Sequence, residues 1–349
     1  MRQQIKKAMD LKDFTYKELS SRTGHSEGVL NKFISKGESV KFEIVLDIIR
    51  LLLPDDEEVL MFSYCQNANT PKQIKAAIEY SSTHWNWDVV KELIGKCETS
   101  NNKEINEWGY FYNVFYQWKQ EDINSDEMYE IIRNKKTIYP ELKAFKRFLE
   151  MYNFYTIDDF VFVDKLSIYF TEEMDSLDDG YIKDSYYARY HQVMAHVSLY
   201  VKCLPEQARQ ISLKGIQYNI GSSFNAFFYN IIAASYFNVS DLKMNHYALK
   251  SLDIYSEICT IEQIDDMKVR FEKFNIIMNK EYNKEFTKND DDPIDLFIEG
   301  VRNSDINKLI QCLVNFIKYG DKFLSCLPAR QLALLGYDKN IIDSIQSIK

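Results

Sequence analysis

The stretch from Thr15 to Phe33 reads TYKELSSRTGHSEGVLNKF and contains two short segments of apolar periodicity on either side of Gly24. Leu19 and the small Ser20 are expected to face inward on the first segment. Gly24 permits the left-handed backbone that a tight turn between two helices requires. Ser26 is expected to cap the second helix. The buried face of that helix is expected to consist of Val29, Leu30 and Phe33. This spacing is typical of helix-turn-helix units of the lambda repressor and Cro type, although Ser20 stands where that pattern usually has Ala.

The second helix, expected from Ser26 to about Ser35, would present polar side chains on its outer face. Asparagine can bind adenine through two hydrogen bonds and glutamate can accept one from cytosine, whereas lysine more often contacts phosphate. The residues predicted to contact DNA are Ser26, Glu27, Asn31, Lys32 and Lys36. A plain helical hairpin around a glycine turn is the alternative interpretation of the same pattern.

A third amphipathic helix, expected over Phe42 to Leu53, would close the small core, and Pro54 would end it. The sequence therefore predicts a helix-turn-helix DNA-binding domain over residues 1–54. Residues 1–53 carry ten Lys and Arg against seven Asp and Glu, a balance of +3, so the rest of the −9 chain carries −12. This asymmetry favours nucleic-acid binding by residues 1–54, the head of the chain, and not by the rest. A net charge of +3 over some fifty residues is, however, also within ordinary variation.

The remainder of the 349-residue chain is expected to be an all-α solenoid over residues 55–349. Only 11 Gly and 6 Pro are present, about half the average usage, which leaves few of the turns that β folds need. A weak repeat relates Met194–Tyr200, followed by Ala208, to Ile232–Phe237, followed by Ala248. Its spacing of about 40 residues is that of a helix pair with small residues at the close approach, as in tetratricopeptide-like repeats.

The sequence nominates no catalytic or metal-binding constellation. Phosphate-binding glycine loops, the GxSxG and HExxH patterns and paired cysteines are absent from it, and its six Cys and five His share no ligand spacing. We therefore expect neither an enzyme nor a metal or other cofactor. The charged N-terminus and the lack of long apolar runs predict a cytoplasmic protein that does not span a membrane.

Several segments spread through the chain resemble the AimR arbitrium receptors of temperate Bacillus phages. Four of them carry most of the resemblance: LMFSYC at 60–65, KAAIEY at 75–80, YIKDSY at 181–186 with Arg189, and FIKYGDKF at 316–323. Further matching positions are Arg302, Asn303, Lys308, Leu327, Pro328, Leu335 and Gly336. The Asp-Lys-Phe segment at 321–323 with the Leu-Pro that follows it is the most specific part.

The resemblance implies a function. AimR-like proteins dimerise through C-terminal helices, bind a palindromic operator and activate transcription that favours the lytic programme. A secreted hexapeptide ending in Arg-Gly-Ala or similar then enters the solenoid and switches activation off. The resemblance implies that the protein is located in the cytoplasm of the bacterial host. It also implies three partners: operator DNA, a short signalling peptide that carries an arginine, and a second copy of the chain.

The resemblance also implies a peptide site. Asp321 matches an acidic position that receives the peptide's arginine, with Asp295 as an assisting carboxylate, and Phe323 and Phe274 match apolar walls. His196 and Tyr200 occupy positions where family members often place Asn pairs, and Ser222 and Ser223 stand where they carry an arginine. The residues expected to contact the peptide are His196, Tyr200, Asn230, Phe274, Asp295, Asp321 and Phe323. Read without the resemblance, Asp321 is more simply a helix cap after Gly320.

An aliphatic stripe near the C-terminus predicts a dimer interface within residues 325–349. Its residues are Leu332, Leu334, Leu335, Ile341, Ile342, Ile345 and Ile348. A helix that folds back and caps the solenoid is the alternative. For the whole chain, the alternative function is a peptide-regulated helical-repeat protein that sequesters or dephosphorylates a signalling partner without binding DNA.

Overall fold

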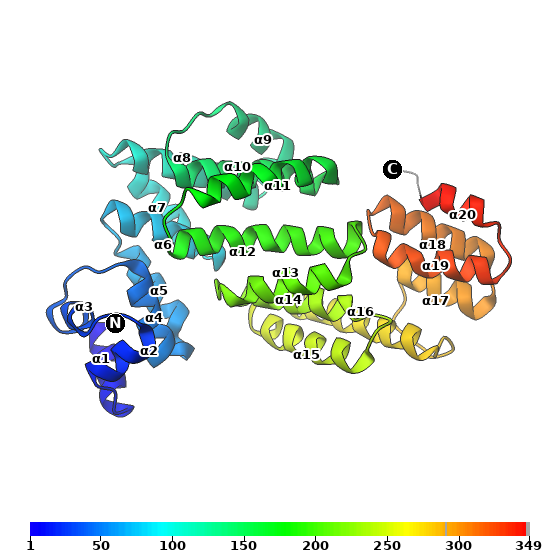
Figure 1. The fold of residues 1–349 in the computed structure, drawn as a ribbon, viewed down its shortest axis with the longest axis horizontal. Coiled ribbons are helices and arrows are strands. Elements are labelled where there is room, and N and C mark those ends of the chain that lie inside the picture. The colour runs from blue at the N-terminus through cyan, green and yellow to red at the C-terminus, as the bar shows by residue number, and fades with distance from the viewer. Residues whose placement is uncertain (290–291, 347–349) are drawn as a thin grey trace. The chain divides into compact units, whose positions relative to one another are not determined.

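The computed structural model describes residues 1–289 and 292–346, and these contain helices but no β-strand (Figure 1). The all-α prediction is confirmed. The first helices are α1 (Arg2–Leu11), α2 (Tyr16–Thr23), α3 (Glu27–Asn31), the π-helix η1 (Lys32–Lys36), α4 (Phe42–Leu52) and the 3₁₀ helix η2 (Pro54–Asp56). They are followed by α5 (Glu57–Gln66), α6 (Pro71–Thr83), α7 (Trp87–Glu98), α8 (Lys103–Lys119), α9 (Ser125–Asn134), α10 (Pro140–Thr156) and α11 (Phe160–Asp175).

The second half of the chain continues the same architecture. Its elements are α12 (Tyr181–His196), the π-helix η3 (Val197–Val201), α13 (Pro205–Gln217), α14 (Ser222–Ser235), α15 (Asp241–Ile258) and α16 (Ile261–Asn279), then α17 (Pro293–Asn303), α18 (Ile306–Lys318), α19 (Lys322–Leu334) and α20 (Lys339–Gln346). Among the described residues, no helix is long and apolar enough to cross a membrane.

The chain divides into two compact units, Met1–Tyr186 and Tyr187–Lys349, and the boundary falls inside α12. The first unit contains the four-helix head together with α5 to α11. The predicted domain boundary at residue 54 coincides with the start of η2, and the division of the chain into folding domains there stays a prediction.

In the first unit the head is joined to the helices that follow it by an aromatic cluster. Phe42, the first residue of α4, packs on the rings of Tyr64, Tyr80 and Tyr181, at centroid separations of 6.0, 5.6 and 5.2 Å. Tilted aromatic pairs at these distances contribute beyond the area that they bury. The head is therefore continuous in packing with α5, α6 and the beginning of α12.

In the second unit each helix packs mainly on its neighbours in the chain, from α13 on α14 through to α18 on α19. Gly215 on α13 permits one of these close approaches, since a Cβ at that position would lie 2.2 Å from the ring of Phe228 on α14. The small residues of the weak repeat, Ala208 and Ala248, are likewise buried. Packing of successive helix pairs is what a solenoid predicts.

Candidate functional site

The head has the predicted helix-turn-helix geometry. Thr15 and Glu18 form a capping box at the start of α2: the Thr15 hydroxyl accepts the N–H of Glu18 at 3.2 Å, and the Glu18 carboxylate accepts the N–H of Thr15 at 2.7 Å. The Thr15 N–H and, at 2.9 Å, the Thr15 hydroxyl both donate to the Glu18 carboxylate and hold its pKa below its usual value. Gly24 ends α2 at a φ of 74°, a left-handed conformation that favours glycine. Leu19, which lies on α2 between the capping box and Gly24, is fully buried.

The second helix of the motif begins at Glu27 and runs through η1 to Lys36, one residue beyond the predicted end. Leu30, Phe33 and Ile34 form its buried face. Two details differ from expectation. Ser26 occupies the N-cap position, but its side chain makes no capping bond. Val29 is only half-buried because it borders a hollow in the first unit. All five residues predicted to contact DNA are exposed: Ser26, Glu27, Asn31, Lys32 and Lys36.

The hollow beside Val29 has a volume of about 1000 Å³ and is lined by residues of the head, α6 and the loop before α12. Lys32 is one of its lining residues. Gln73 on α6 donates to the hydroxyl of Ser39 at 3.1 Å, which fixes the loop after η1. Sequence periodicity could not indicate this hollow, because its walls come from segments more than a hundred residues apart.

In the second unit, several residues predicted to bind peptide gather around Tyr200, at the end of η3. The rings of His196 and Tyr200 are 4.7 Å apart, and the ring of Phe323 on α19 lies 6.4 Å from Tyr200. Burial, with a contribution from the nearby Arg270, lowers the pKa of His196 to about 4. His196 is therefore neutral at pH 7. Burial raises the pKa of Tyr200, so the phenol keeps its proton.

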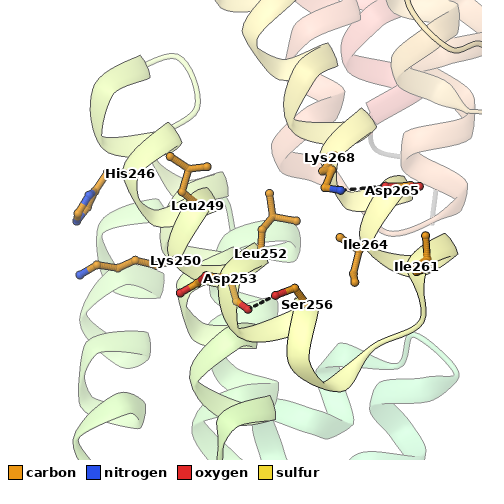
Figure 2. A pocket seen from close by; sticks show the side chains of 10 residues that line it. All are labelled: His246, Leu249, Lys250, Leu252, Asp253, Ser256, Ile261, Ile264, Asp265 and Lys268. Atoms are coloured by element: carbon orange, nitrogen blue, oxygen red, sulfur yellow. Dashed lines mark hydrogen bonds and ion pairs between the residues drawn. The ribbon is translucent and has the colours of Figure 1, made fainter.

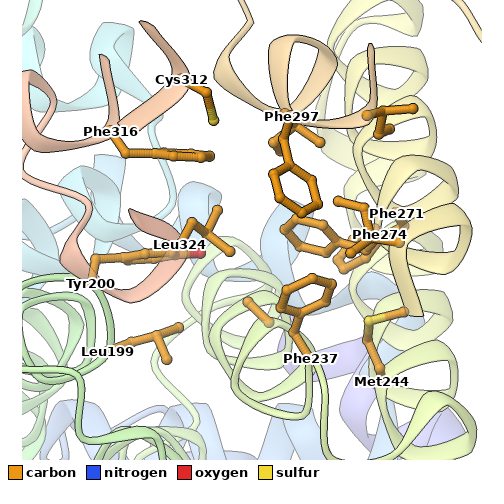
Figure 3. Close-up of a cluster of buried hydrophobic side chains, with 14 of the residues drawn as sticks. Leu199, Tyr200, Phe237, Met244, Phe271, Phe274, Phe297, Cys312, Phe316 and Leu324 are labelled. Carbon is orange, nitrogen blue, oxygen red and sulfur yellow. The ribbon is translucent and has the colours of Figure 1, made fainter. Parts of the chain in front are cut away.

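Arg270 on α16 is a member of this group that sequence reasoning missed. Its guanidinium carbon lies 5.9 Å from the ring centre of Tyr200 and 5.6 Å from that of Phe274, and Nη2 donates to the Tyr200 hydroxyl at 3.4 Å. Tyr200 and Phe274 both belong to the hydrophobic cluster in Figure 3. The i, i+4 spacing of Arg270 and Phe274 was the available signal, since residues so spaced share a helix face.

Asp321 faces the same group and also caps α19, where its Oδ1 accepts the N–H of Leu324 at 2.8 Å. Burial raises the pKa of this carboxyl to about 6, although the Leu324 N–H and the charge of Arg270 act in the opposite direction. The capping interpretation is therefore confirmed, and Asp321 also interacts electrostatically with Arg270 and Tyr200.

Two residues predicted for the same site lie in other surroundings. Asp295 is buried, and its carboxylate pairs with Nζ of Lys273 at 2.6 Å and accepts the N–H of Asn289 at 2.6 Å. A carboxylate already neutralised in this way is poorly placed to assist Asp321 with a second cation. Asn230 is half-buried on α14, and within the described residues no hydrogen bond joins its side chain to the Tyr200 group.

A second hollow, of about 840 Å³, lies between α15 and α16 and contains none of the predicted residues. Figure 2 shows Leu252 and Ile264 on its walls, with Lys268 paired to Asp265 at 3.0 Å beside them. Within the described ranges, no group of three or more His, Cys, Asp or Glu is arranged to hold a metal ion.

The predicted dimer residues differ in exposure. Leu334 is 72% exposed, and Leu335 and Ile341 are also exposed. Leu332 and Ile342 are buried, and Ile345 packs partly against the core of its own unit. α20 thus contributes one face to the fold of a single chain, as the capping alternative requires, and leaves Ile341 on the other. Ile348 lies outside the described residues.

Comparisons with known proteins agree with the resemblance. Residues 57–292 match the family model described as AimR transcriptional regulator-like. The AimR transcriptional regulator of Bacillus phage SPbeta is 23% identical over 246 residues, which are 70% of this chain and 62% of the relative. That of Bacillus phage phi3T is 29% identical over 176 residues, 50% of this chain and 45% of the relative. The matches thus span less than two thirds of these curated relatives.

Two solved structures share the fold. Selenomethionine phAimR has a TM-score of 0.80 at 20% identity, with 99% of each chain covered. A phAimR–ligand structure has a TM-score of 0.67 at 20% identity and covers 86% of this chain and 98% of that one. Together with a family match over residues 57–292, most of the sequence, these findings establish that the chain belongs to the AimR transcriptional regulator-like family.

Proposed function

We propose that this chain is a transcriptional regulator that binds operator DNA through its helix-turn-helix head and is gated by a short peptide. DNA binding is supported mainly by one observation: the second helix of the helix-turn-helix motif has one buried face and one exposed face. Leu30 and Phe33 are buried, while Asn31, Lys32 and Lys36 are exposed on the same helix. A helix that reads the major groove needs such an uncovered polar face.

The peptide-binding part of the proposal is supported by the group around Tyr200. Its aromatic rings come from η3, α16 and α19, and it contains one cationic and one anionic side chain, Arg270 and Asp321. Concave helical repeats bind extended peptides on surfaces where side chains of successive helices converge. A site with both charges suits a zwitterionic peptide better than an apolar ligand.

By analogy with the family, we further propose an arbitrium-type activator whose activity the peptide switches off. A homodimer would place two heads on a palindromic operator, because a two-fold protein matches a two-fold site. Leu334, Leu335 and Ile341 are exposed apolar residues available for such an interface.

The alternative is a helical-repeat interaction protein that sequesters or dephosphorylates a partner. The function of such a protein does not require Asn31 and Lys32 to be exposed on the outer face of the second helix of the helix-turn-helix motif. It would bind peptide but show no preference for operator over random DNA.

A gel-shift experiment with the full chain tests the proposal. The DNA upstream of the protein's own gene is compared with a shuffled sequence of equal length, with and without the peptide encoded just downstream. We expect retention of the upstream DNA alone and its release by the peptide. Equal retention of both DNAs would refute sequence-specific binding, and retention that no peptide alters would refute the gating.

A further inference from the structure

Arg270 differs from the arginines that form ion pairs with glutamate in the described part of the chain. Arg50, Arg133, Arg147 and Arg209 each have a glutamate carboxylate within salt-bridge distance. Among the described residues, Arg270 has none, and its hydrogen bond is the long one to the Tyr200 hydroxyl. Asp321 acts on it electrostatically from farther away.

The neighbouring cation on the same helix is already neutralised. Lys273, three residues beyond Arg270, is buried and pairs with Asp292 at 2.8 Å and Asp295 at 2.6 Å. Arg270, in contrast, is exposed to solvent although aromatic rings flank it. Of these two cations of α16, Arg270 is therefore the one with donors available to a ligand.

The aromatic rings fix what those donors can bind. A guanidinium packed against the rings of Tyr200 and Phe274 keeps its N–H groups in the plane of the guanidinium, pointing away from the ring faces. A carboxylate matches this planar fork with two parallel hydrogen bonds.

We propose that Arg270 is a specificity-determining residue of the peptide site and binds a carboxylate of the ligand. This inference rests on the proposed function, because it assigns the anionic end of the same site. The ligand would then span from Arg270 to Asp321, with its cationic group at Asp321. Either the C-terminal α-carboxylate or an acidic side chain can supply the carboxylate.

Synthetic peptides distinguish these sources. The probes are hexapeptides that end in Arg-Gly-Ala, with the first three positions varied, prepared as free acids and as C-terminal amides. A third set replaces every Asp and Glu by Asn and Gln but keeps the free C-terminus. Binding to the full-length wild-type chain is followed by thermal shift, and the best peptide is then measured by calorimetry.

The variants are Arg270→Gln, Arg270→Lys and, as a control, Lys268→Gln, which removes an exposed cation on the same helix that pairs only at the surface with Asp265. We expect removal of the responsible carboxylate to weaken binding to wild type by about tenfold or more, as for loss of a charge-assisted hydrogen bond. In Arg270→Gln, the peptides with and without this carboxylate should bind with equal affinity. Arg270→Lys should keep part of it, and Lys268→Gln all of it.

The inference and the proposed function fail in different ways. If neither C-terminal amidation nor replacement of Asp and Glu weakens binding to wild type, or if Arg270→Gln still discriminates as wild type does, Arg270 is not the anion-binding residue although the protein is a peptide receptor. If no peptide stabilises the wild-type chain, the peptide-gated function is refuted and the assignment of Arg270 is refuted with it. An unchanged melting temperature of the free Arg270→Gln chain excludes misfolding as the cause of lost binding.

Discussion

Oε1 of Glu43 accepts the backbone N–H of Tyr181 at 3.0 Å, so the first turn of α4 in the head is bonded to the N-terminus of α12. The first N–H groups of a helix have no partner within it, and a carboxylate there also interacts favourably with the helix dipole. The rings of Phe42 and Tyr181 pack beside this bond at 5.2 Å. Adjacent polar and aromatic contacts therefore hold α4 to the N-terminus of α12.

Glu43→Ala is expected to lower the free energy of unfolding by about 1–2 kcal/mol, because the N–H of Tyr181 loses its acceptor. Glu43→Gln keeps an acceptor oxygen and should cost less. Urea unfolding of the full chain measures both. If alanine and glutamine cost the same, the bond to Tyr181 contributes little and the aromatic contact alone joins the two helices.

Asn31→Ala should reduce the preference for operator over random DNA by about 1–3 kcal/mol, the usual contribution of a two-bond contact to a base. Asn307→Ala, which alters an exposed asparagine on α18, is the matched control. Gel shifts with both DNAs give the ratio. An unchanged ratio in Asn31→Ala would mean that another residue or another helix reads the sequence.

The dimer prediction is best tested with the exposed residues. Leu334→Glu combined with Ile341→Glu should convert a dimer to a monomer without loss of fold, because both side chains are exposed in the single chain. Ile342→Ala should instead destabilise the fold by about 2–4 kcal/mol, because it leaves a cavity in the core. Sedimentation and urea unfolding separate the effects, and a double variant that remains dimeric would place the interface elsewhere.

At Asp321 the cap and the charge can be separated. Asp321→Asn should keep the bond to the Leu324 N–H, because Asn caps helices as well as Asp does. The same substitution should strongly weaken the binding of a cationic peptide. Asp321→Ala should also lose about 1 kcal/mol of stability. Calorimetry with a hexapeptide ending in Arg-Gly-Ala and urea unfolding report the two roles. Undiminished affinity in the Asn variant would leave Asp321 as a cap alone.

The raised pKa of Asp321 predicts two opposite pH dependences. With a folded value of about 6 against an ordinary value of 3.8, the folded state holds a proton that the unfolded state has released. The contribution of this residue to stability is thus full below about pH 3.8 and is lost as the pH rises through 6. Affinity for a cationic peptide should instead fall as the pH drops through 6, since the carboxylate becomes neutral. Calorimetry at pH 7.5 and 5.0 tests this, and Asp321→Asn should show no such change.

The amino-acid sequence alone determined the helical class, the turn at Gly24 and the buried face that includes Leu30 and Phe33. These features depend on interactions within a few residues, such as capping bonds, left-handed glycine and apolar periodicity, so they can be read locally. The position of Asp321 as a helix cap is local in the same way. The matching segments distributed along the chain indicated the family correctly.

The tertiary structure alone decided which charges meet which partners. Arg270 contacts Tyr200, 70 residues earlier in the chain, and Lys273 on the same helix neutralises the Asp295 that sequence reasoning had placed at the peptide site. Ile342 and Ile341 are neighbours in a single aliphatic stripe, yet one is buried and the other exposed. Helix periodicity gives the faces of each helix, but which face another helix covers depends on long-range packing. Burial, ion pairing and the availability of Arg270 follow from that packing.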